Sequence, residues 1–373
     1  MKFGFLPLLL ALFVGAVQAH KPSDSFLALS VDGAALRGQW DIALRDLEFA
    51  IGLDADGNGE ITWGELRARH ADIAAYALAR LALTAEGRNC RLSPTGHLVD
   101  EHSDGAYAVL RFEADCGARA PGTIEVAYSL FFDLDPTHRG LLRFERGGGA
   151  QTGVLSPEHP KLSFRAGETS RLAQFGDYLR EGVWHIWIGF DHILFLLSLL
   201  LPAVLLRSRR AWAPATGFRP VFWEVFRVVT SFTVAHSITL SLAALSVISL
   251  PSRLVESTIA LSVLLAALNN LWPVVAERRW AVAFAFGLIH GFGFASVLTD
   301  LGLPQGALLL ALVGFNVGVE LGQLAIVGGF LPLAYALRRS WFYRRLVLAG
   351  GSAAITLVAA IWLVERIFDL KLL

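Results

Sequence analysis

Residues 183–206 read VWHIWIGFDHILFLLSLLLPAVLL. Apart from His185, Asp191 and His192, this run is almost wholly apolar. Because a helix rises about 1.5 Å per residue, about 20 apolar residues cross a hydrocarbon core of about 30 Å. The segment is therefore predicted to be a membrane-spanning helix.

Five more apolar segments follow this one. They lie near residues 226–248, 254–275, 281–299, 306–336 and 346–365. The sequence thus predicts an α-helical polytopic membrane bundle of six transmembrane helices over residues 181–373. The fifth segment is longer than a span needs, so it must tilt or break, and Pro332 is a candidate position for a break.

The composition supports a membrane protein with two unlike parts. The 373 residues are 54% hydrophobic and 17% charged, whereas soluble domains have about 25% charged residues. The 32 basic residues only balance the 32 acidic ones, so no basic excess is left to bind nucleic-acid phosphates. Residues 1–180 hold 23 acidic and 18 basic residues, and residues 181–373 hold 9 and 14, which predicts a domain boundary near residue 180.

The N-terminus has the pattern of an export signal. Residues 1–19 contain Lys2, a short apolar core and a small-x-small cleavage site that ends at Ala19. The alternative is a first membrane helix, which is disfavoured because the apolar core is short. Cleavage after Ala19 would place residues 20–180 outside the cytoplasm.

Arginine residues predict the orientation of the bundle, because they gather in alternate loops. They are Arg207, Arg209, Arg210, Arg219, Arg278, Arg279, Arg338, Arg339, Arg344 and Arg345. By the positive-inside rule these loops lie in the cytoplasm. The N-terminal domain and the C-terminus are then both extracytoplasmic, in agreement with a cleaved signal.

Residues 20–180 are predicted to form a mixed α/β extracytoplasmic domain that is β-rich and sandwich-like. Alternation of apolar and polar residues predicts antiparallel strands over residues 25–31, 106–112, 123–133 and 141–146. Helical periodicity predicts helices over residues 41–53 and 63–83. Cys90 and Cys116 both lie here, and an oxidising compartment allows either a disulfide or two buried thiols.

The loop between these two predicted helices reads DADGNGEITWGE, residues 54–65. It matches the EF-hand calcium loop, with oxygen-bearing residues at alternate positions, glycine at the sixth and glutamate at the twelfth. The predicted Ca²⁺ ligands are Asp54, Asp56, Asn58, Glu60 through its carbonyl, Thr62 and Glu65. The alternative is an acidic surface turn. Because EF-hands usually pair and one loop is visible, we interpret it as a structural clip rather than a sensor.

Ionisable side chains inside the predicted spans are the strongest functional signal. They are His185, Asp191, His192, His236, Glu256, His290 and Glu320. Burying each such group in lipid costs about 2.5–3.5 kcal/mol, or about 20 kcal/mol for all of them. They are therefore predicted to face one another, water or a metal ion. For each histidine, the alternative is an interhelical hydrogen bond without a metal.

The position of each group within its span predicts a path. His185 and Glu256 are expected near the outer mouth, and His236, His290 and Glu320 near mid-membrane. This ladder of imidazoles and carboxylates suits borderline divalent ions such as Ni²⁺, Co²⁺, Zn²⁺ or copper.

Small and amide residues add two patterns to the fifth segment. One is a glycine ridge for close helix packing, Gly314, Gly318 and Gly322. The other is a polar stripe, Asn316, Glu320 and Gln323. In the third segment, Asn269 and Asn270 either continue a polar path inward or bond across helices.

The motifs of the spans together resemble the HupE/UreJ family of hydrogenase and urease accessory membrane proteins, in its branch with a large exported domain. The resemblance rests on His185, Gly189, Asp191 and His192, on Gly287-Leu-Ile-His290-Gly291, and on Phe315-Asn316-Val-Gly318-Val-Glu320. It implies a nickel-permease-like protein of the bacterial inner (plasma) membrane. Ile186 and Phe294 stand where better-known nickel permeases have Pro and a second His, so other transition metals stay open.

Three functions are therefore considered. The first is a permease for a divalent transition-metal ion, Ni²⁺ favoured, in which the bilayer-embedded ligands His185, Asp191, His192, His236, Glu256, His290, Asn316 and Glu320 pass the ion inward and the exported domain collects or gates it. The second is an intramembrane zinc-dependent hydrolase with Glu256 or Glu320 as base. The third is a non-transporting accessory protein that docks a metalloenzyme-maturation partner.

Overall fold

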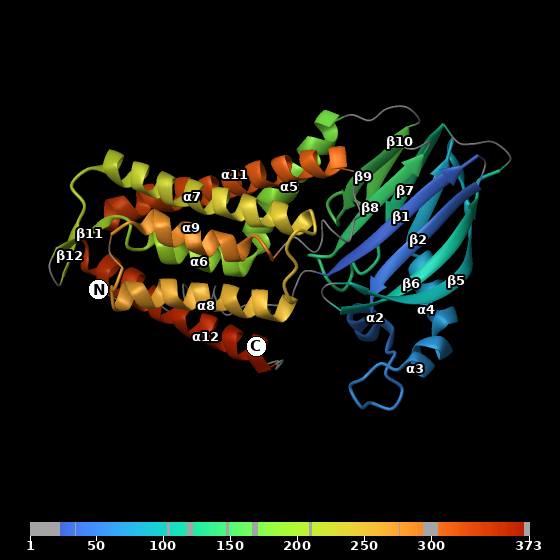
Figure 1. Ribbon diagram of the computed structural model, residues 1–373, viewed down its shortest axis with the longest axis horizontal. Helices are drawn as coiled ribbons and strands as arrows, with labels where there is room; N and C mark the ends of the chain where they lie inside the picture. Colours follow the sequence, from blue (N-terminus) through green and yellow to red (C-terminus); the bar gives the residue numbers. More distant parts are fainter. Residues whose placement is uncertain are drawn as a thin grey trace, which may run out of the picture.

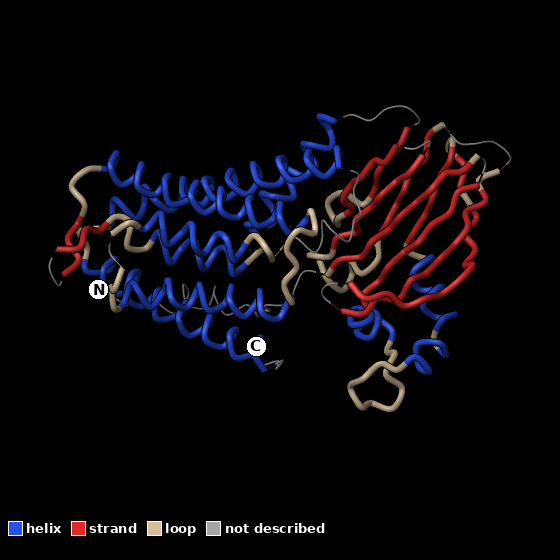
Figure 2. Tube along the Cα trace, in the orientation of Figure 1, coloured by secondary structure: helices blue, strands red, loops and turns tan. Residues whose placement is uncertain are grey.

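The computed structural model describes residues 23–33, 35–102, 105–117, 122–146, 149–165, 171–208, 211–275, 277–293 and 305–368. A β-rich domain and a helical bundle lie end to end along the long axis of the molecule (Figures 1 and 2). The predicted signal peptide, residues 1–19, lies outside the described residues.

The larger sheet of the β-rich domain has six strands in the order β5-β6-β2-β1-β8-β9. Their bounds are β1 Asp24–Asp32, β2 Ala35–Ala43, β5 Arg91–His102, β6 Gly105–Asp115, β8 Arg139–Arg146 and β9 Gly149–Leu155. Neighbours are antiparallel except β1 and β8, which run parallel with Asp24 opposite Arg139. The wholly antiparallel arrangement that we predicted is therefore wrong at this one pair.

The second sheet has four strands in the order β10-β7-β3-β4. Their bounds are β3 Leu81–Ala85, β4 Arg88–Asn89, β7 Thr123–Tyr128 and β10 Lys161–Arg165. One apolar core contains residues from both sheets, such as Leu27 and Phe112 from the larger and Leu83 and Val126 from the smaller. Cys90 and Cys116 form a disulfide. The predicted mixed α/β, sandwich-like domain is thus present.

Three predicted elements of this domain have other bounds in the structure. The helix expected from residue 41 begins three residues later, as α2 (Leu44–Ile51), because Trp40 and Ile42 alternate into the sandwich core and keep the chain in β2. The helix expected over 63–83 is α3 (Trp63–Ala68), α4 (His70–Leu78) and then β3. The strand expected to reach residue 133 ends at Tyr128, and Phe131 takes a positive φ in the turn that follows.

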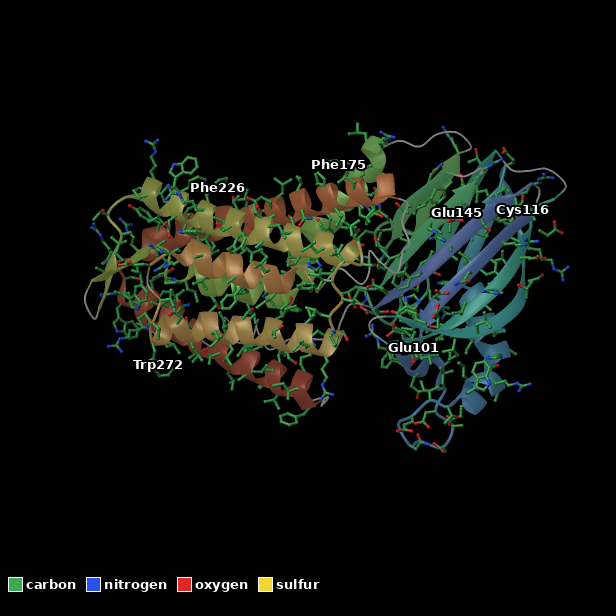
Figure 3. All side chains as sticks on the ribbon, viewed as in Figure 1. Glu101, Cys116, Glu145, Phe175, Phe226 and Trp272 are labelled. Carbon is green, nitrogen blue, oxygen red and sulfur yellow. A yellow bond between two sulfur atoms is a disulfide. The ribbon has the colours of Figure 1, made fainter. Side chains whose placement is uncertain are left out.

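The bundle contains the apolar segments of the sequence. Its elements are α5 Arg171–Ile188, α6 Phe190–Leu200, the hairpin of β11 Leu205–Ser208 and β12 Ala211–Pro214, α7 Phe218–Ala244, α8 Ser252–Leu271, α9 Arg279–His290, α11 Gln305–Leu337, the π-helical turn η1 Tyr343–Gly350 and α12 Gly351–Phe368. The exposed Trp272 lies at the end of the bundle remote from the sandwich (Figure 3), as expected for an aromatic side chain at a membrane interface.

Four helical stretches in the described part of the chain are long and apolar enough to cross a membrane. They are Phe218–Ala244, Ser252–Leu271, Leu308–Leu337 and Tyr343–Phe368. The bent pair α5–α6 makes a fifth if it is taken as one span. The described helix α9 is shorter, and residues 294–299 of the predicted fourth span lie outside the described residues. The fold is that of a membrane protein, and the full six-span count stays a prediction.

Three details of the predicted spans differ in the structure. The first span is not one straight helix, because α5 and α6 meet at an angle of 71° at Gly189. The chain also leaves the helix after Leu200 and forms the β11–β12 hairpin. Pro332 does not break the fifth span, since α11 continues through it. A proline removes one backbone hydrogen bond, which a long packed membrane helix tolerates.

Candidate metal centre

The break between α5 and α6 positions the first group of polar side chains. Gly189 lies between the two helices, and a Cβ there would be 2.7 Å from the His185 carbonyl oxygen and 2.9 Å from Nδ1 of His192. Only glycine therefore fits this close turn. The 71° bend directs His185 from the end of α5 and Asp191 and His192 from the start of α6 toward one region.

Glycines bring α11 against α5. A Cβ on Gly318 would lie 2.0 Å from the Leu179 carbonyl oxygen, and one on Gly182 would lie 2.0 Å from the Phe315 carbonyl oxygen. Gly314 and Gly322 also contact α5. The glycine ridge of the fifth segment is therefore a surface for close helix packing.

Glycines also bring α9 against α7. A Cβ on Gly287 would lie 2.5 Å from the Phe232 carbonyl oxygen, and one on Gly291 would lie 2.4 Å from the His236 carbonyl oxygen. Because Gly291 follows His290 directly, this contact places His290 beside the helix that carries His236.

Four imidazoles gather where these helices meet. The ring centroid of His192 lies 4.6 Å from that of His185, 5.2 Å from His290 and 6.4 Å from His236. His236 and His290 are fully buried, and His192 is 5% exposed. The expected ladder is thus a compact cluster.

Aromatic rings line this cluster. Phe195 and Phe232 lie 4.9 Å and 5.3 Å from the His290 ring, and Phe315 lies 5.2 Å from the His185 ring. These walls were not predicted, because a phenylalanine in a membrane segment looks the same in sequence whether it faces lipid or a site.

Hydrogen bonds fix the tautomers of two imidazoles. Oδ1 of Asp191 accepts a hydrogen bond from Nδ1 of His192 at 2.9 Å. Nδ2 of Asn316 donates to the Leu312 carbonyl, which leaves Oδ1 of Asn316 facing Nδ1 of His236 at 3.2 Å. Since both partners are acceptors, Nδ1 carries the proton in each ring, and each Nε2 has a lone pair.

The third imidazole has the opposite tautomer. Ser262 donates its hydroxyl proton to the Ile259 carbonyl, so its oxygen must accept from Nε2 of His290 at 2.8 Å. Nδ1 of His290 therefore has the lone pair. Ser262 was not predicted as part of the site, because one serine in an apolar segment gives no distinguishing signal.

These lone pairs lack hydrogen-bond donors. Within the described residues, no partner reaches Nε2 of His192, Nε2 of His236 or Nδ1 of His290. A buried polar atom without a partner costs about 1–3 kcal/mol. Lone pairs of neutral imidazoles are also the atoms that bind transition metals.

The donor atoms form two overlapping groups. Those of His185, His192 and His236 lie within 4.8 Å of one another, and so do those of Asp191, His192 and His290. Donors that share one tetrahedral ion lie about 3.3 Å apart, so a small inward movement would let either group hold an ion. His192 belongs to both groups.

The remaining predicted ligands have other partners. Glu256 forms an ion pair with Arg366 at 3.0 Å, and Glu320 accepts a hydrogen bond from Thr230 at 2.7 Å. Asn316 contributes through His236. Asn270 donates to the Ser198 carbonyl and so bonds across helices, as one of our two alternatives had it.

The predicted calcium loop also brings acidic side chains together. One carboxylate oxygen each of Asp54, Asp56 and Glu65 lies within 4.8 Å of the others. Backbone N–H groups of Gly57 and Gly59 donate to Asp54, and such bonds lower the pKa of the Asp54 and Glu65 carboxyls. Asn58, Glu60 and Thr62 lie on the same loop, and Thr62 caps α3 together with Glu65.

A family model described as HupE / UreJ protein matches residues 162–366, which is more than half of the chain. The match begins within β10 and contains every residue of the imidazole cluster. It does not contain the calcium loop or most of the sandwich. No curated protein matches the chain.

Proposed function

The chain belongs to the HupE/UreJ family, and we propose that it is a membrane permease for a divalent transition-metal ion, with Ni²⁺ as the leading substrate. The family is associated with uptake of nickel or cobalt, or with accessory functions. One observation carries the proposal: donor atoms of four imidazoles and of Asp191 form two groups that share His192, and three of these imidazoles have a buried nitrogen with no hydrogen-bond partner among the described residues.

The donor set accounts for the class of ion. Four imidazoles and the Asp191 carboxylate suit borderline ions such as Ni²⁺, Co²⁺ and Zn²⁺, whereas Ca²⁺ and Mg²⁺ prefer oxygen ligands. The hydrogen bond from His192 to Asp191 orients the ring and makes its Nε2 more basic. Asn316 does the same for the ring orientation of His236.

The overlap of the two donor groups supports movement of the ion. An ion that passes from His185 and His236 to Asp191 and His290 keeps His192 as a ligand throughout. The ion is then never left without a protein ligand in an apolar surrounding, which would be costly.

The proposed arrangement places residues 1–19 as a cleaved signal peptide, 20–180 outside the cytoplasm and 181–373 as six spans in the plasma membrane, with the C-terminus extracytoplasmic. The Arg-rich loops and the apolar helices support this topology. Lipid and the metal ion are the proposed partners.

Calcium is proposed to stabilise the loop over residues 54–65. The clustered carboxylates of Asp54, Asp56 and Glu65 repel one another unless a cation joins them. Glu65→Gln should lower Ca²⁺ affinity at least tenfold and remove the Ca²⁺-dependent rise in melting temperature. If Ca²⁺ raised the melting temperatures of wild type and Glu65→Gln equally, the proposed stabilisation of this loop by calcium would be refuted.

Metal uptake in cells and in proteoliposomes tests the permease. His192→Ala or His290→Ala should abolish accumulation of Ni²⁺, because each removes a ligand from the cluster. His159→Ala, a change outside the bundle, is the matched control and should leave uptake unchanged. Normal uptake by both cluster variants would overturn the proposal.

The same preparations separate the alternatives. A zinc-dependent hydrolase should copurify with one tightly held Zn²⁺, whereas a permease should exchange its ion readily. Glu256 and Glu320, the bases considered for hydrolysis, bond to Arg366 and Thr230. An accessory protein that only docks a maturation partner should bind metal or a partner without any flux into liposomes.

A further inference from the structure

A second cluster of metal-binding side chains lies in the sandwich, outside the bundle. Asp41 on β2 and Asp100 and His102 on β5 each offer one donor atom, and these atoms lie within 4.8 Å of one another. The strand register brings them together, since β2 and β5 both pair with β6 and Tyr107 lies opposite both Ala43 and Asp100.

The three donor atoms are close enough for a small movement to bring them onto one ion. Nε2 of His102 lies 3.2 Å from Oδ2 of Asp41. Two donors on one tetrahedral ion lie about 3.3 Å apart. The His102 ring is held between Phe26 and Tyr107, with centroids 4.9 Å and 4.1 Å away, so its orientation is fixed in advance.

Within the described residues, the Asp41 carboxylate is not paired with a lysine or an arginine. The Asp41 side chain is 11% exposed. Its partners within the described residues are Gln39, which donates at 3.1 Å, and His102, so neither Lys nor Arg neutralises it. With Asp100 nearby, two carboxylates converge on one imidazole. A largely buried carboxylate requires a cation, which is either a protonated His102 or a metal ion.

The cluster lies at the junction with the bundle. Phe26 and Tyr107, which flank His102, belong to one apolar cluster with Tyr178 of α5 and with Leu308 and Phe315 of α11. Glu101, between the two β5 ligands, lies on the bundle side of the sandwich (Figure 3).

We propose that Asp41, Asp100 and His102 form a second site for a divalent transition-metal ion, in the exported domain at its junction with the bundle. One imidazole and two carboxylates suit Zn²⁺, Ni²⁺ or Co²⁺, and the remaining coordination positions are left to water. The site would hold an ion before it enters the bundle, and this role, unlike the binding itself, rests on the proposed permease function.

Stoichiometry of Ni²⁺ binding to the purified full-length protein tests the site. The measurement uses competition with a chelating indicator in excess Ca²⁺, which keeps the 54–65 loop filled. In a His192→Ala background, which removes the shared ligand of the bundle, we expect one Ni²⁺ per chain. Addition of His102→Ala or of Asp41→Asn should abolish this binding.

His97→Ala is the matched control, because His97 lies on the same strand and stacks on His70 instead. It should retain the ion. Failure of the His192→Ala protein to bind Ni²⁺, or retention of the ion after both His102→Ala and Asp41→Asn, would overturn the site and favour a protonated His102. Asp41→Asn preserves the shape of the side chain, so its melting temperature shows whether loss of binding reflects misfolding.

Uptake separates this site from the proposed function. If the protein is a permease, His102→Ala alone should raise the Ni²⁺ concentration for half-maximal uptake about tenfold and leave the maximal rate unchanged. If no variant and no wild-type protein transports metal, the permease proposal fails, and the binding stoichiometry still decides whether the junction site exists.

Discussion

Buried histidines occur in both parts of the molecule, and their surroundings differ. His138 in the sandwich is fully buried, like His236 and His290 in the bundle. Nδ1 of His138 lies 2.5 Å from Oγ of Ser23, and Nε2 lies 2.5 Å from the Tyr128 hydroxyl. Both of its nitrogens are therefore satisfied, whereas each of three bundle imidazoles leaves one nitrogen without a partner in the described residues.

The hydrogen bonds around His138 have one consistent assignment of donors and acceptors. Ser23 donates to Asp46, so it accepts from Nδ1 of His138, and Nε2 of His138 then accepts from Tyr128. Tyr128 in turn accepts from Ser25, which accepts from the Trp40 indole. Every proton has a place in this chain and no lone pair of His138 is left for a ligand. Burial of a histidine thus does not identify a site, whereas an unpartnered nitrogen that lies close to other metal-binding donor atoms points to one.

The largest difference is expected when a bundle histidine becomes apolar. His290→Leu should abolish uptake and metal binding by the group of Asp191, His192 and His290, while the metal-free bundle keeps or gains thermal stability, because an unsatisfied buried nitrogen is removed. Ser262 still donates to the Ile259 carbonyl in this variant. Calorimetry without metal and equilibrium metal binding check both parts. A large loss of metal-free stability would mean that His290 is a structural residue like His138.

The same change in the sandwich should act in the opposite sense. His138→Leu leaves Tyr128 without its acceptor and Ser23 without its donor, so the free energy of unfolding of this domain should fall by about 3 kcal/mol. Hydrogen exchange of the β1 and β8 amides reports it in the full-length protein. Metal binding by the bundle should be unchanged, and its loss would contradict the separation of the two regions.

Acid should weaken the sandwich through His138. Burial lowers the pKa of His138 to about 3, with help from the charges of Arg139 and Arg45, whereas an unfolded histidine has a pKa of about 6.5. The unfolded state therefore binds a proton first, and stability present above about pH 6.5 is lost as the pH falls. Between pH 7 and pH 5 the loss from this group is about 2 kcal/mol. The His138→Leu protein should lack this part of the pH dependence of stability. If wild type and His138→Leu lost stability equally steeply between pH 7 and pH 5, the assignment of this loss to His138 would be wrong.

The smallest expected effect is on the residue that orients a bundle histidine. Asn316→Ala removes the acceptor that fixes Nδ1–H of His236, so the ring is free to turn and metal affinity should fall about tenfold. Asn316→Asp retains an acceptor and should restore most of the affinity. Equal affinities for wild type and Asn316→Ala would show that His236 needs no such partner.

The strands of the sandwich were harder to predict than the membrane helices, for a physical reason. β5 reads RLSPTGHLVDEH, contains Pro94 and Gly96 at a register shift, and buries few side chains, so it shows little alternation. β9 reads GAQTGVL and is similarly weak. Because β5 carries Asp100 and His102, the junction cluster was not visible from the sequence.

The sequence by itself determined that this is a membrane protein of the HupE/UreJ family, since apolar runs and the spacing of residues within one motif are local properties. It also identified the polar side chains inside the bundle. The tertiary structure alone decided that His185, Asp191, His192, His236 and His290 converge while Glu256 and Glu320 bond elsewhere. The reason is that convergence depends on the break at Gly189 and on backbone contacts at glycines of α9 and α11, which join segments far apart in the chain.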